Sequence, residues 1–204
     1  ATSLPREILA EEGYDGVIQL YSLVGKGVHR EIEDDVFSEI NKFLPNLSLE
    51  DLLRLLSYKE VEASGRFVAP IITNIRKKLT GFGLSDSPEL HILLTNEEIC
   101  STPGQRRLVR ERILEIIAAA TNLEDTFCVY VSYPKWEKFI RDSFLDKIES
   151  LINKGQLKQI PEEKLETWLR DLIDKKDVSY DDRLNYERLG RLFEEELEIK
   201  RWGD

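Results

Sequence analysis

The sequence predicts an all-α fold, arranged as an α-solenoid of about five helix-turn-helix repeats. The first observation is a leucine-rich helix that opens on an acidic residue and recurs along the chain. These acidic residues are Asp15, Asp51, Glu89, Asp125 and Glu163. Their spacings alternate between 36 and 38 residues, and a fixed period of this length with two helices per period is typical of a solenoid. A plain bundle of helices of similar length remains the alternative.

The second observation is an amphipathic helix that follows each leucine-rich helix. Its apolar residues recur at spacings of three and four, which places them on one helix face. The apolar triplets are Val36/Ile40/Phe43, Ile71/Ile75/Leu79, Val109/Ile113/Ile117, Phe144/Ile148/Ile152 and Leu189/Leu192/Phe193. We therefore assign residues 1–204 to a single helical-repeat domain, with an N-terminal arm at 1–12, repeats at 13–180 and a capping helix at 181–204.

Residues 47–79 contain the clearest copy of the repeat. Ser48 can cap the free backbone N–H groups of a helix whose first turn is acidic, as the helix dipole favours. The leucines that follow cover more than one face of this helix, so we expect neighbours on both sides. In the partner helix, residues 66–79, we expect Pro70 near the first turn and Gly81 just beyond the end.

The same register places the remaining helices. We expect a short helix or an arm at 1–12, and helices at 13–24, 29–44, 89–100, 105–120, 136–153, 162–174 and 183–200. Ser179 to Asp182 would cap the last of them. Residues 122–133 are the doubtful element, because their β-branched and aromatic side chains would pass as a strand. The register predicts a helix there, and we adopt that interpretation.

The composition limits the partners and the cellular compartment that the sequence predicts. The formal net charge of −10 argues against non-specific adhesion to nucleic acid or acidic membranes. No apolar run approaches the roughly 20 residues that span a bilayer. Cys100 and Cys128 match no metal or disulfide spacing, which favours a reducing compartment. The chain contains no methionine, so we expect a processed or trimmed N-terminus, left by removal of a targeting peptide or by trimming.

Catalytic signatures are not found. Gly25-Lys-Gly27 lacks the spacing of a phosphate loop, and Ser132-Tyr-Pro-Lys135 matches a nucleophile motif whose companion motifs are missing. The carboxylates of residues 29–44 are best explained as the solvated face of an amphipathic helix. His91 lies in an apolar run and is expected to pack in the core. The sequence thus predicts a protein that is not an enzyme, with no catalytic, cofactor or metal residues and no small-molecule substrate.

Two basic clusters and one aromatic residue are the candidate contact residues. The clusters are Arg76, Lys77 and Lys78 in one helix, and Arg106, Arg107 and Arg110 in the equivalent helix of the next repeat. Stacked repeats would join them into one basic stripe for a phosphate backbone or an acidic partner. The alternative is a set of surface charges paired with Glu111, Glu115 and other acids. Trp202 is a candidate anchor for a partner, because aromatic residues dominate interface hot spots.

The repeat resembles a known group of proteins. Leu47-Ser-Leu-Glu-Asp-Leu-Leu-Arg-Leu-Leu56, followed by an amphipathic helix, is similar to the helical-hairpin repeats of octotricopeptide and FAST-kinase-like proteins, and more loosely to pentatricopeptide repeats. The resemblance covers most of the chain, although Ser57-Tyr-Lys-Glu60 replaces the usual continuation of the first helix. It implies an organellar, mitochondrial helical-repeat protein. Some such proteins serve as accessory subunits of ribosomes or of the ATP synthases of protists.

The predicted function is that of a non-enzymatic accessory or structural subunit of a large mitochondrial assembly, such as an ATP synthase or a ribosome, acting by protein–protein contact. The alternative is an organellar RNA-binding repeat protein that uses the two basic clusters on phosphates. We expect other protein subunits as partners, RNA being disfavoured by the net charge, and no membrane span. The expected location is the mitochondrial matrix, after removal of a targeting peptide, with the cytoplasm as the alternative.

Overall fold

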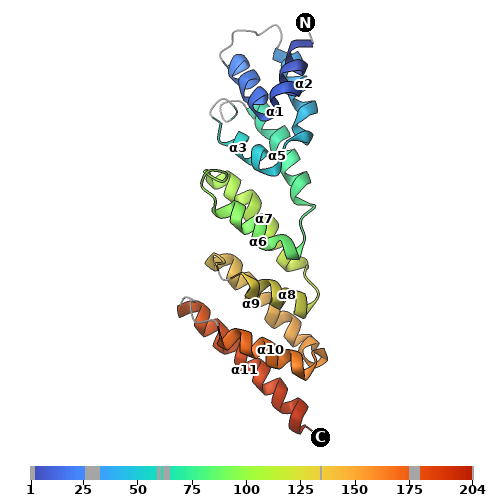
Figure 1. The fold of residues 1–204 in the computed structure, drawn as a ribbon, viewed down its shortest axis with the longest axis vertical. Helices are drawn as coiled ribbons and strands as arrows, with labels where there is room; N and C mark the ends of the chain where they lie inside the picture. Colours follow the sequence, from blue (N-terminus) through green and yellow to red (C-terminus); the bar gives the residue numbers. More distant parts are fainter. Residues whose placement is uncertain are drawn as a thin grey trace. The chain divides into compact units, whose positions relative to one another are not determined.

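The protein is all-α. A computed structural model describes residues 3–25, 33–58, 61, 65–133, 135–174 and 180–203, and within these ranges it contains helices and no strand (Figure 1). The α-helices are α1 (Ser3–Gly25), α2 (Glu33–Phe43), α3 (Leu49–Leu56), α5 (Gly65–Leu79), α6 (Ser87–Thr95), α7 (Pro103–Ala119), α8 (Leu123–Ser132), α9 (Lys138–Asn153), α10 (Glu162–Ile173) and α11 (Tyr180–Trp202). Short 3-10 turns lie at η2 (Leu44–Asn46), η3 (Leu84–Asp86) and η4 (Gln156–Gln159). The predicted fold class is confirmed at this level.

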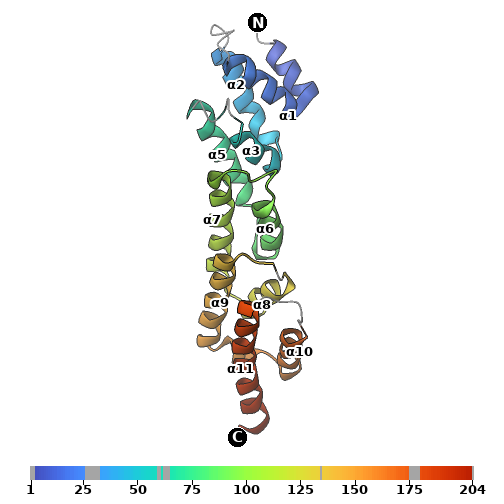
Figure 2. The same cartoon turned by 90° about the vertical axis from the view of Figure 1, so that its left-hand side faces the viewer.

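The described residues group into two compact units. The first unit comprises residues 1–82 and 89–112, and the second comprises residues 83–88 and 113–204. In the first unit α1 packs against α2 and α3 packs against α5; in the second, α8 packs against α9 and α10 against α11 (Figures 1 and 2). Each leucine-rich helix of these four pairs therefore contacts the amphipathic helix that follows it, as the sequence predicts.

The first helix is bent at a glycine. Gly13 adopts φ 56° and ψ −119°, so α1 consists of two helical segments that meet at a kink. A Cβ placed on Gly16 would lie 2.8 Å from the backbone oxygen of Ile8, so the two segments approach too closely there for any side chain. The segment predicted as an arm or short helix is helical from residue 3, and Leu9 is buried.

The central pair follows its predicted signals closely. The Ser48 side chain accepts a hydrogen bond from the backbone N–H of Asp51 at 3.0 Å and caps α3. Leu52, Leu53 and Leu55 are fully buried, as expected of a helix with neighbours on both sides. The predicted place of Pro70 is wrong by one turn. It is the sixth residue of α5, so its ring falls inside the helix, where the backbone forgoes one hydrogen bond.

The helix predicted at 89–100 ends earlier, at Thr95. The backbone oxygen of Asn96 accepts from Cys100 at 2.8 Å, and the chain then turns into α7. Thr102 and Gln105 form a reciprocal cap, in which the Thr102 N–H donates to the Gln105 side chain at 2.6 Å. The fully buried Gln105 amide also donates to Leu53 O on α3, so this one side chain fixes the start of α7 against the preceding pair.

The doubtful segment at 122–133 is a helix, as the register predicts. Asn122 caps α8 by accepting from the backbone N–H of Asp125 at 3.0 Å. The ring of Phe127 lies 4.5 Å from that of Trp168 and 5.2 Å from that of Phe193, centroid to centroid. Aromatic packing of this kind outweighs the strand preference of the segment, because secondary-structure propensity is only a weak prior.

The last three helices occupy their predicted places with small shifts. The final helix α11 begins at Tyr180 and runs to Trp202, two residues beyond its predicted end. The proposed cap residue Ser179 lies outside the described residues. His91 is 1% exposed, which confirms its predicted core position. Among the described residues, no helix has the length and apolar character needed to cross a bilayer.

Candidate functional site

One type of contact recurs between helices. A cation on one amphipathic helix bonds an acceptor on the preceding amphipathic helix. Arg66 of α5 donates to Asp34 of α2 at 2.6 Å, and Arg112 of α7 donates to the Leu79 carbonyl of α5 at 3.0 Å. In the second unit Lys147 of α9 reaches the Ala118 carbonyl of α7 at 2.6 Å, and Arg188 of α11 reaches Glu149 of α9 at 2.9 Å. Each of these amphipathic helices is therefore joined to the preceding amphipathic helix by a cation that bonds a carboxylate or a backbone carbonyl.

The first predicted basic cluster lies in the last turn of α5. Arg76 and Lys77 are exposed and Lys78 is half-buried. None of the three forms an ion pair with another described residue. The contact of Arg112 with the Leu79 carbonyl places α7 beside this turn, so the two predicted clusters lie on neighbouring helices of the first unit.

The second cluster is largely engaged within the chain. Arg106 donates to the Cys100 carbonyl at 2.9 Å, and Arg107 lies 3.7 Å from Glu111 one turn along α7. Arg110 is half-buried and has an interaction partner as well. Arg107 and Glu111 thus form one of the pairs that the surface-charge interpretation expects. A role for the basic residues in partner or RNA contact stays a prediction.

Trp202 lies at the end of α11 and is 84% exposed. The last helical pair also leaves Ile173, 68% exposed, Ile199, 59% exposed, and Leu184, 46% exposed, in solvent. Exposed apolar side chains mark an interaction site when they form one large patch, whereas singly exposed ones are common on protein surfaces. The sequence identified Trp202 but not the two isoleucines.

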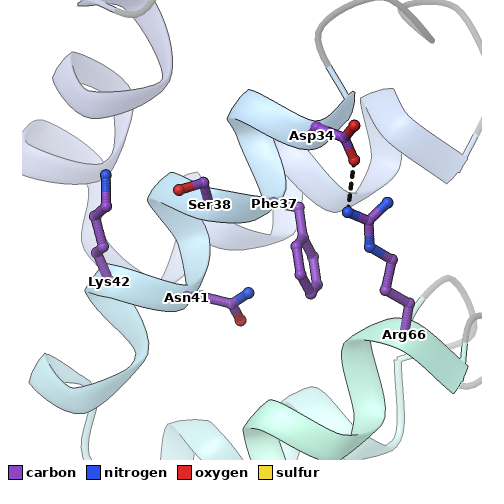
Figure 3. A pocket seen from close by; sticks show the side chains of 6 residues that line it. All are labelled: Asp34, Phe37, Ser38, Asn41, Lys42 and Arg66. Carbon is purple, nitrogen blue, oxygen red and sulfur yellow. Dashed lines mark hydrogen bonds and ion pairs between the residues drawn. The ribbon is translucent and has the colours of Figure 1, made fainter.

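A depression lies between α2 and α5 (Figure 3). Its centre is the ring of Phe37, over which the Arg66 guanidinium lies at 4.3 Å while the same group donates to Asp34. Ser38, Asn41 and Lys42 complete the lining. The charged groups are already paired: hydrogen bonds from Lys42 and Arg6 also hold the pKa of Glu39 on the same helix below its usual value. This arrangement joins helices and offers no acid–base or nucleophile–base pair.

Two grooves run alongside α11. The first, of about 750 Å³, runs between α9 and α11, and Arg188 crosses it to reach Glu149. The second, of about 340 Å³, runs between α10 and α11. Its apolar lining is Leu169, Ile173 and Leu197, and its charged lining is Glu166, Arg170 and Arg201.

The groove between α10 and α11 was missed by sequence reasoning, although a signal existed. Leu169 and Ile173 are four residues apart, on a row of α10 separate from the buried row of Leu165, Trp168 and Leu172. A second apolar row on a helix indicates a second contact surface. The sequence alone is equally consistent with both rows of α10 packing in the core, so it does not identify the groove.

Among the described residues the cysteines and carboxylates show no metal or redox arrangement. Both thiols are free, Cys100 buried and Cys128 exposed. Burial raises the pKa of the Cys100 thiol to about 11, so it is protonated and unreactive near neutral pH. In the part of the chain that the structure describes, no group of three His, Cys, Asp or Glu side chains could hold a metal ion.

Comparison with known proteins returned no match: no protein-family model, no curated protein and no solved structure resembles this chain significantly.

Proposed function

We propose that this chain is a non-enzymatic helical-repeat protein, an α-solenoid of helical hairpins that acts by protein–protein contact as a structural or accessory subunit of a larger assembly. The recurring cation contact carries the proposal. It joins α5 to α2, α7 to α5, α9 to α7 and α11 to α9, at sequence separations of 32, 33, 29 and 39 residues. Contacts between successive amphipathic helices at separations of 29 to 39 residues, about one repeat length, are what stacked hairpins produce.

Stacked hairpins favour a binding role over a catalytic one. In an α-solenoid each repeat contacts its neighbours, and repeat proteins use the outer surface that remains to hold partners. The exposed Ile173, Ile199 and Trp202 supply the apolar and aromatic anchors that such contacts need. Several charged groups that line the described grooves are paired within the chain, Arg66 with Asp34, Arg188 with Glu149 and Arg201 with Glu166, an arrangement that serves contact better than chemistry.

The proposed setting is a mitochondrial assembly such as a ribosome or an ATP synthase. This part rests on the likeness of residues 47–79 to octotricopeptide and FAST-kinase-like repeats. The low cysteine content agrees with a reducing compartment of this kind.

Contact with protein is favoured over contact with RNA for a specific reason. Two arginines of the basic helix α7 are committed to backbone carbonyls, Arg106 to Cys100 and Arg112 to Leu79, Thr80 and Phe82. Over the whole chain 39 acids outnumber 29 cations, which gives a net charge of −10. Affinity for nucleic acid comes mainly from cations that neutralise phosphates, so an acidic surface works against it.

Gentle affinity purification of the protein from native cells, with and without nuclease, followed by sizing and mass spectrometry, tests the proposal. We expect recovery in a stoichiometric assembly that resists nuclease. Recovery of the chain alone, or with transcripts that nuclease removes, would contradict it.

A further inference from the structure

We propose that α11 pairs antiparallel with α11 of a second copy of this chain, so that Trp202 of each copy enters the groove between α9 and α11 of the other. The inference rests on the proposed function, because it names one partner of the surface that carries Trp202; the subunit would then join its assembly as a pair. It is supported by an exposed row of side chains on α11, by the lining of the groove and by the order of the charges along the helix.

The helix α11 carries a second row of side chains opposite its core row. The core row consists of buried residues, Tyr186, Leu189, Phe193 and Leu197. The outer row consists of residues that follow one another at spacings of three and four, Leu184, Arg188, Arg191, Glu195, Ile199 and Trp202. At 3.6 residues per turn the two rows lie on opposite sides of the helix. Leu184 is 46% exposed, Ile199 59% and Trp202 84%, so the outer row is a second, uncovered apolar surface.

The neighbouring helices flank this row without covering it. On one flank α10 packs along α11 and is bonded to it through Glu166 and Arg201 (Figure 2). On the other flank Glu149 of α9 accepts from Arg188 at 2.9 Å, and the groove of about 750 Å³ runs between the two helices. The groove is lined by Glu149, Ile152, Asn153, Leu184, Asn185, Arg188, Arg191 and Leu192. The first half of the outer row therefore forms one wall of the groove.

Trp202 matches this groove in chemistry. An indole presents a large apolar surface and a single N–H donor. The groove offers apolar walls that include Leu184, and the side-chain amides of Asn153 and Asn185 supply acceptor oxygens. Trp202 cannot reach Leu184 of its own copy, because the two residues are 18 positions apart on one helix, roughly 27 Å at 1.5 Å per residue. The groove is accessible only to the Trp202 of another copy.

A two-fold axis fixes the register of such a pair. In a two-fold symmetric contact, each residue faces the residue of the other copy that is equally far from the axis. With Leu184 opposite Trp202, the axis passes α11 at the level of Phe193. The same register sets Arg191 of one copy opposite Glu195 of the other. The apolar contact and the charged contact therefore require one and the same alignment.

The charges of the outer row are ordered for antiparallel pairing. The half before the axis carries Arg188 and Arg191, and the half after it carries Glu195, with Glu198 beside the row. Arg191, Glu195 and Glu198 are exposed, and none of them forms an ion pair with another residue that the structure describes. Arg188 bonds Glu149, although its side chain is still 66% exposed. Antiparallel pairing brings the two arginines of each copy against the carboxylates of the other.

This order of charges favours a second copy over other occupants. A purely basic or purely acidic segment would be attracted by one half of the outer row and repelled by the other. A second copy presents both signs in the reverse order by symmetry. The net charge of −10 repels two copies at a distance, but physiological salt screens this repulsion beyond about 8 Å, whereas the facing groups of the outer row meet in contact.

The test measures the mass of the purified full chain by sedimentation equilibrium at physiological ionic strength. Because the face of one helix is smaller than a standard interface of about 1,600 Å², we expect a dimer with a dissociation constant in the micromolar range. Acrylamide quenching of tryptophan fluorescence is the second readout. Trp136 and Trp168 are buried and Trp202 is exposed, so quenching should decrease as the dimer forms.

Charge reversal tests the register. R191E and E195R each set like charges opposite one another at two symmetric places, and each should weaken the dimer at least about tenfold. The double variant R191E/E195R, and an equimolar mixture of the two single variants, restore opposite charges and should recover the dimer. The matched controls R183E and E194R make the same charge changes at exposed residues of α11 outside the outer row, and should weaken it less than about twofold.

Removal of the indole tests the groove. W202S should weaken the dimer at least about tenfold, whereas I92S, at an isoleucine of α6 that is 54% exposed, should weaken it less than about twofold. Circular dichroism checks that each variant keeps its helix content. A wild-type chain that stays monomeric at about 100 micromolar, equal weakening by the controls, or no recovery in the mixture would overturn the inference.

The proposed function is decided separately. A dimer recovered from native extract without other proteins would support this inference and contradict the role of an accessory subunit. A nuclease-resistant assembly that holds a single copy of the chain would support the accessory role and overturn the pairing.

Discussion

Arg112 illustrates what a single residue does in this fold. Its guanidinium donates to the carbonyls of Leu79 at 3.0 Å, Thr80 at 3.4 Å and Phe82 at 2.9 Å. These carbonyls follow the end of α5, where the helix leaves its last acceptors without partners. The sequence shows the positive charge of Arg112 but not its partners, because backbone acceptors carry no sequence signal. The candidate basic stripe could thus be located from sequence, but the engagement of its arginines could not.

Replacing Arg112 with alanine is therefore expected to destabilise the protein by about 1.5–3 kcal/mol, the usual worth of hydrogen bonds to a charged group. Arg107 is the matched control, since its side chain is 73% exposed and meets Glu111 at 3.7 Å on the same helix. Its replacement should cost less than about 1 kcal/mol, as surface ion pairs do. Urea unfolding measures both free energies, and equal losses would contradict the role given to Arg112.

Cys100 gives the stability a pH dependence. Burial raises the pKa of its thiol from 9.0 to about 11, so the unfolded chain loses this proton at a lower pH than the folded chain. Above the unfolded pKa the folded state binds more protons, and stability falls as pH rises from about 9 to about 11. Between pH 9 and 11 we expect the free energy of unfolding of C100A to fall by up to about 2 kcal/mol less than that of the wild type. Near pH 7 the thiol is protonated in both states, so it adds no pH dependence there. Urea unfolding at pH 7, 9 and 11 checks it; identical pH profiles would refute it.

Among the elements, α1 depends on its glycines. Gly16 meets the backbone of Ile8 so closely that an added Cβ would lie 2.8 Å from the carbonyl oxygen. G16A is expected to destabilise the protein by about 1–3 kcal/mol, although alanine is the better helix former, because the backbone must shift. Gly104 near the start of α7 has only the Thr102 hydroxyl, at 3.9 Å, near its notional Cβ. G104A should be neutral or stabilise by up to about 1 kcal/mol in thermal unfolding. A larger loss of stability in G104A than in G16A would contradict the close approach of the two segments of α1.

In α8 the repeat register predicts the structure correctly and the local amino-acid composition does not. Its sequence is rich in β-branched and aromatic residues, so local preference pointed to a strand. The cap at Asn122 and the packing of Phe127 against Trp168 stabilise the helix. Because Trp168 is distant in sequence, the segment itself does not predict this packing. The early end of α6 at Thr95 was missed for a similar reason, since the turn that follows depends on the buried Gln105 of the next helix.

Removal of the Asn122 cap tests this explanation of α8. N122A leaves the Asp125 N–H without its 3.0 Å acceptor and should cost about 1 kcal/mol. N122D keeps an acceptor oxygen at the helix N-terminus and should cost little. Chemical unfolding distinguishes them, and a loss of equal size in both variants would show that the amide itself, and not the cap, is needed.

At the scale of the whole molecule, the period of 36 to 38 residues was the most informative signal in the sequence. It anticipated the all-α class and the pairing of consecutive helices, because each requires only the apolar pattern of the chain. The period did not predict the groove between α10 and α11. That groove depends on which apolar row remains uncovered after folding, and Leu169 and Ile173 look like core residues until the packing is known.

Charge is distributed unevenly over the chain. Residues 65–80 carry four cations and no acid, whereas the chain as a whole has a net charge of −10. In the proposed function, partner contact falls to the exposed apolar side chains of α10 and α11, Ile173, Ile199 and Trp202, and not to Arg76, Lys77 and Lys78. The two surfaces can therefore be separated by substitution.

The most direct measurement compares how much protein co-purifies from nuclease-treated native extract with the wild type, with R76S/K77S/K78S and with I199S/W202S, which removes two exposed apolar side chains of α11. We predict that nuclease leaves the wild-type assembly intact, that the basic triple variant recovers it fully, and that I199S/W202S loses most of it. Loss of the bound material on nuclease treatment, together with its loss in the basic triple variant alone, would contradict protein–protein contact as the function and establish RNA as the ligand.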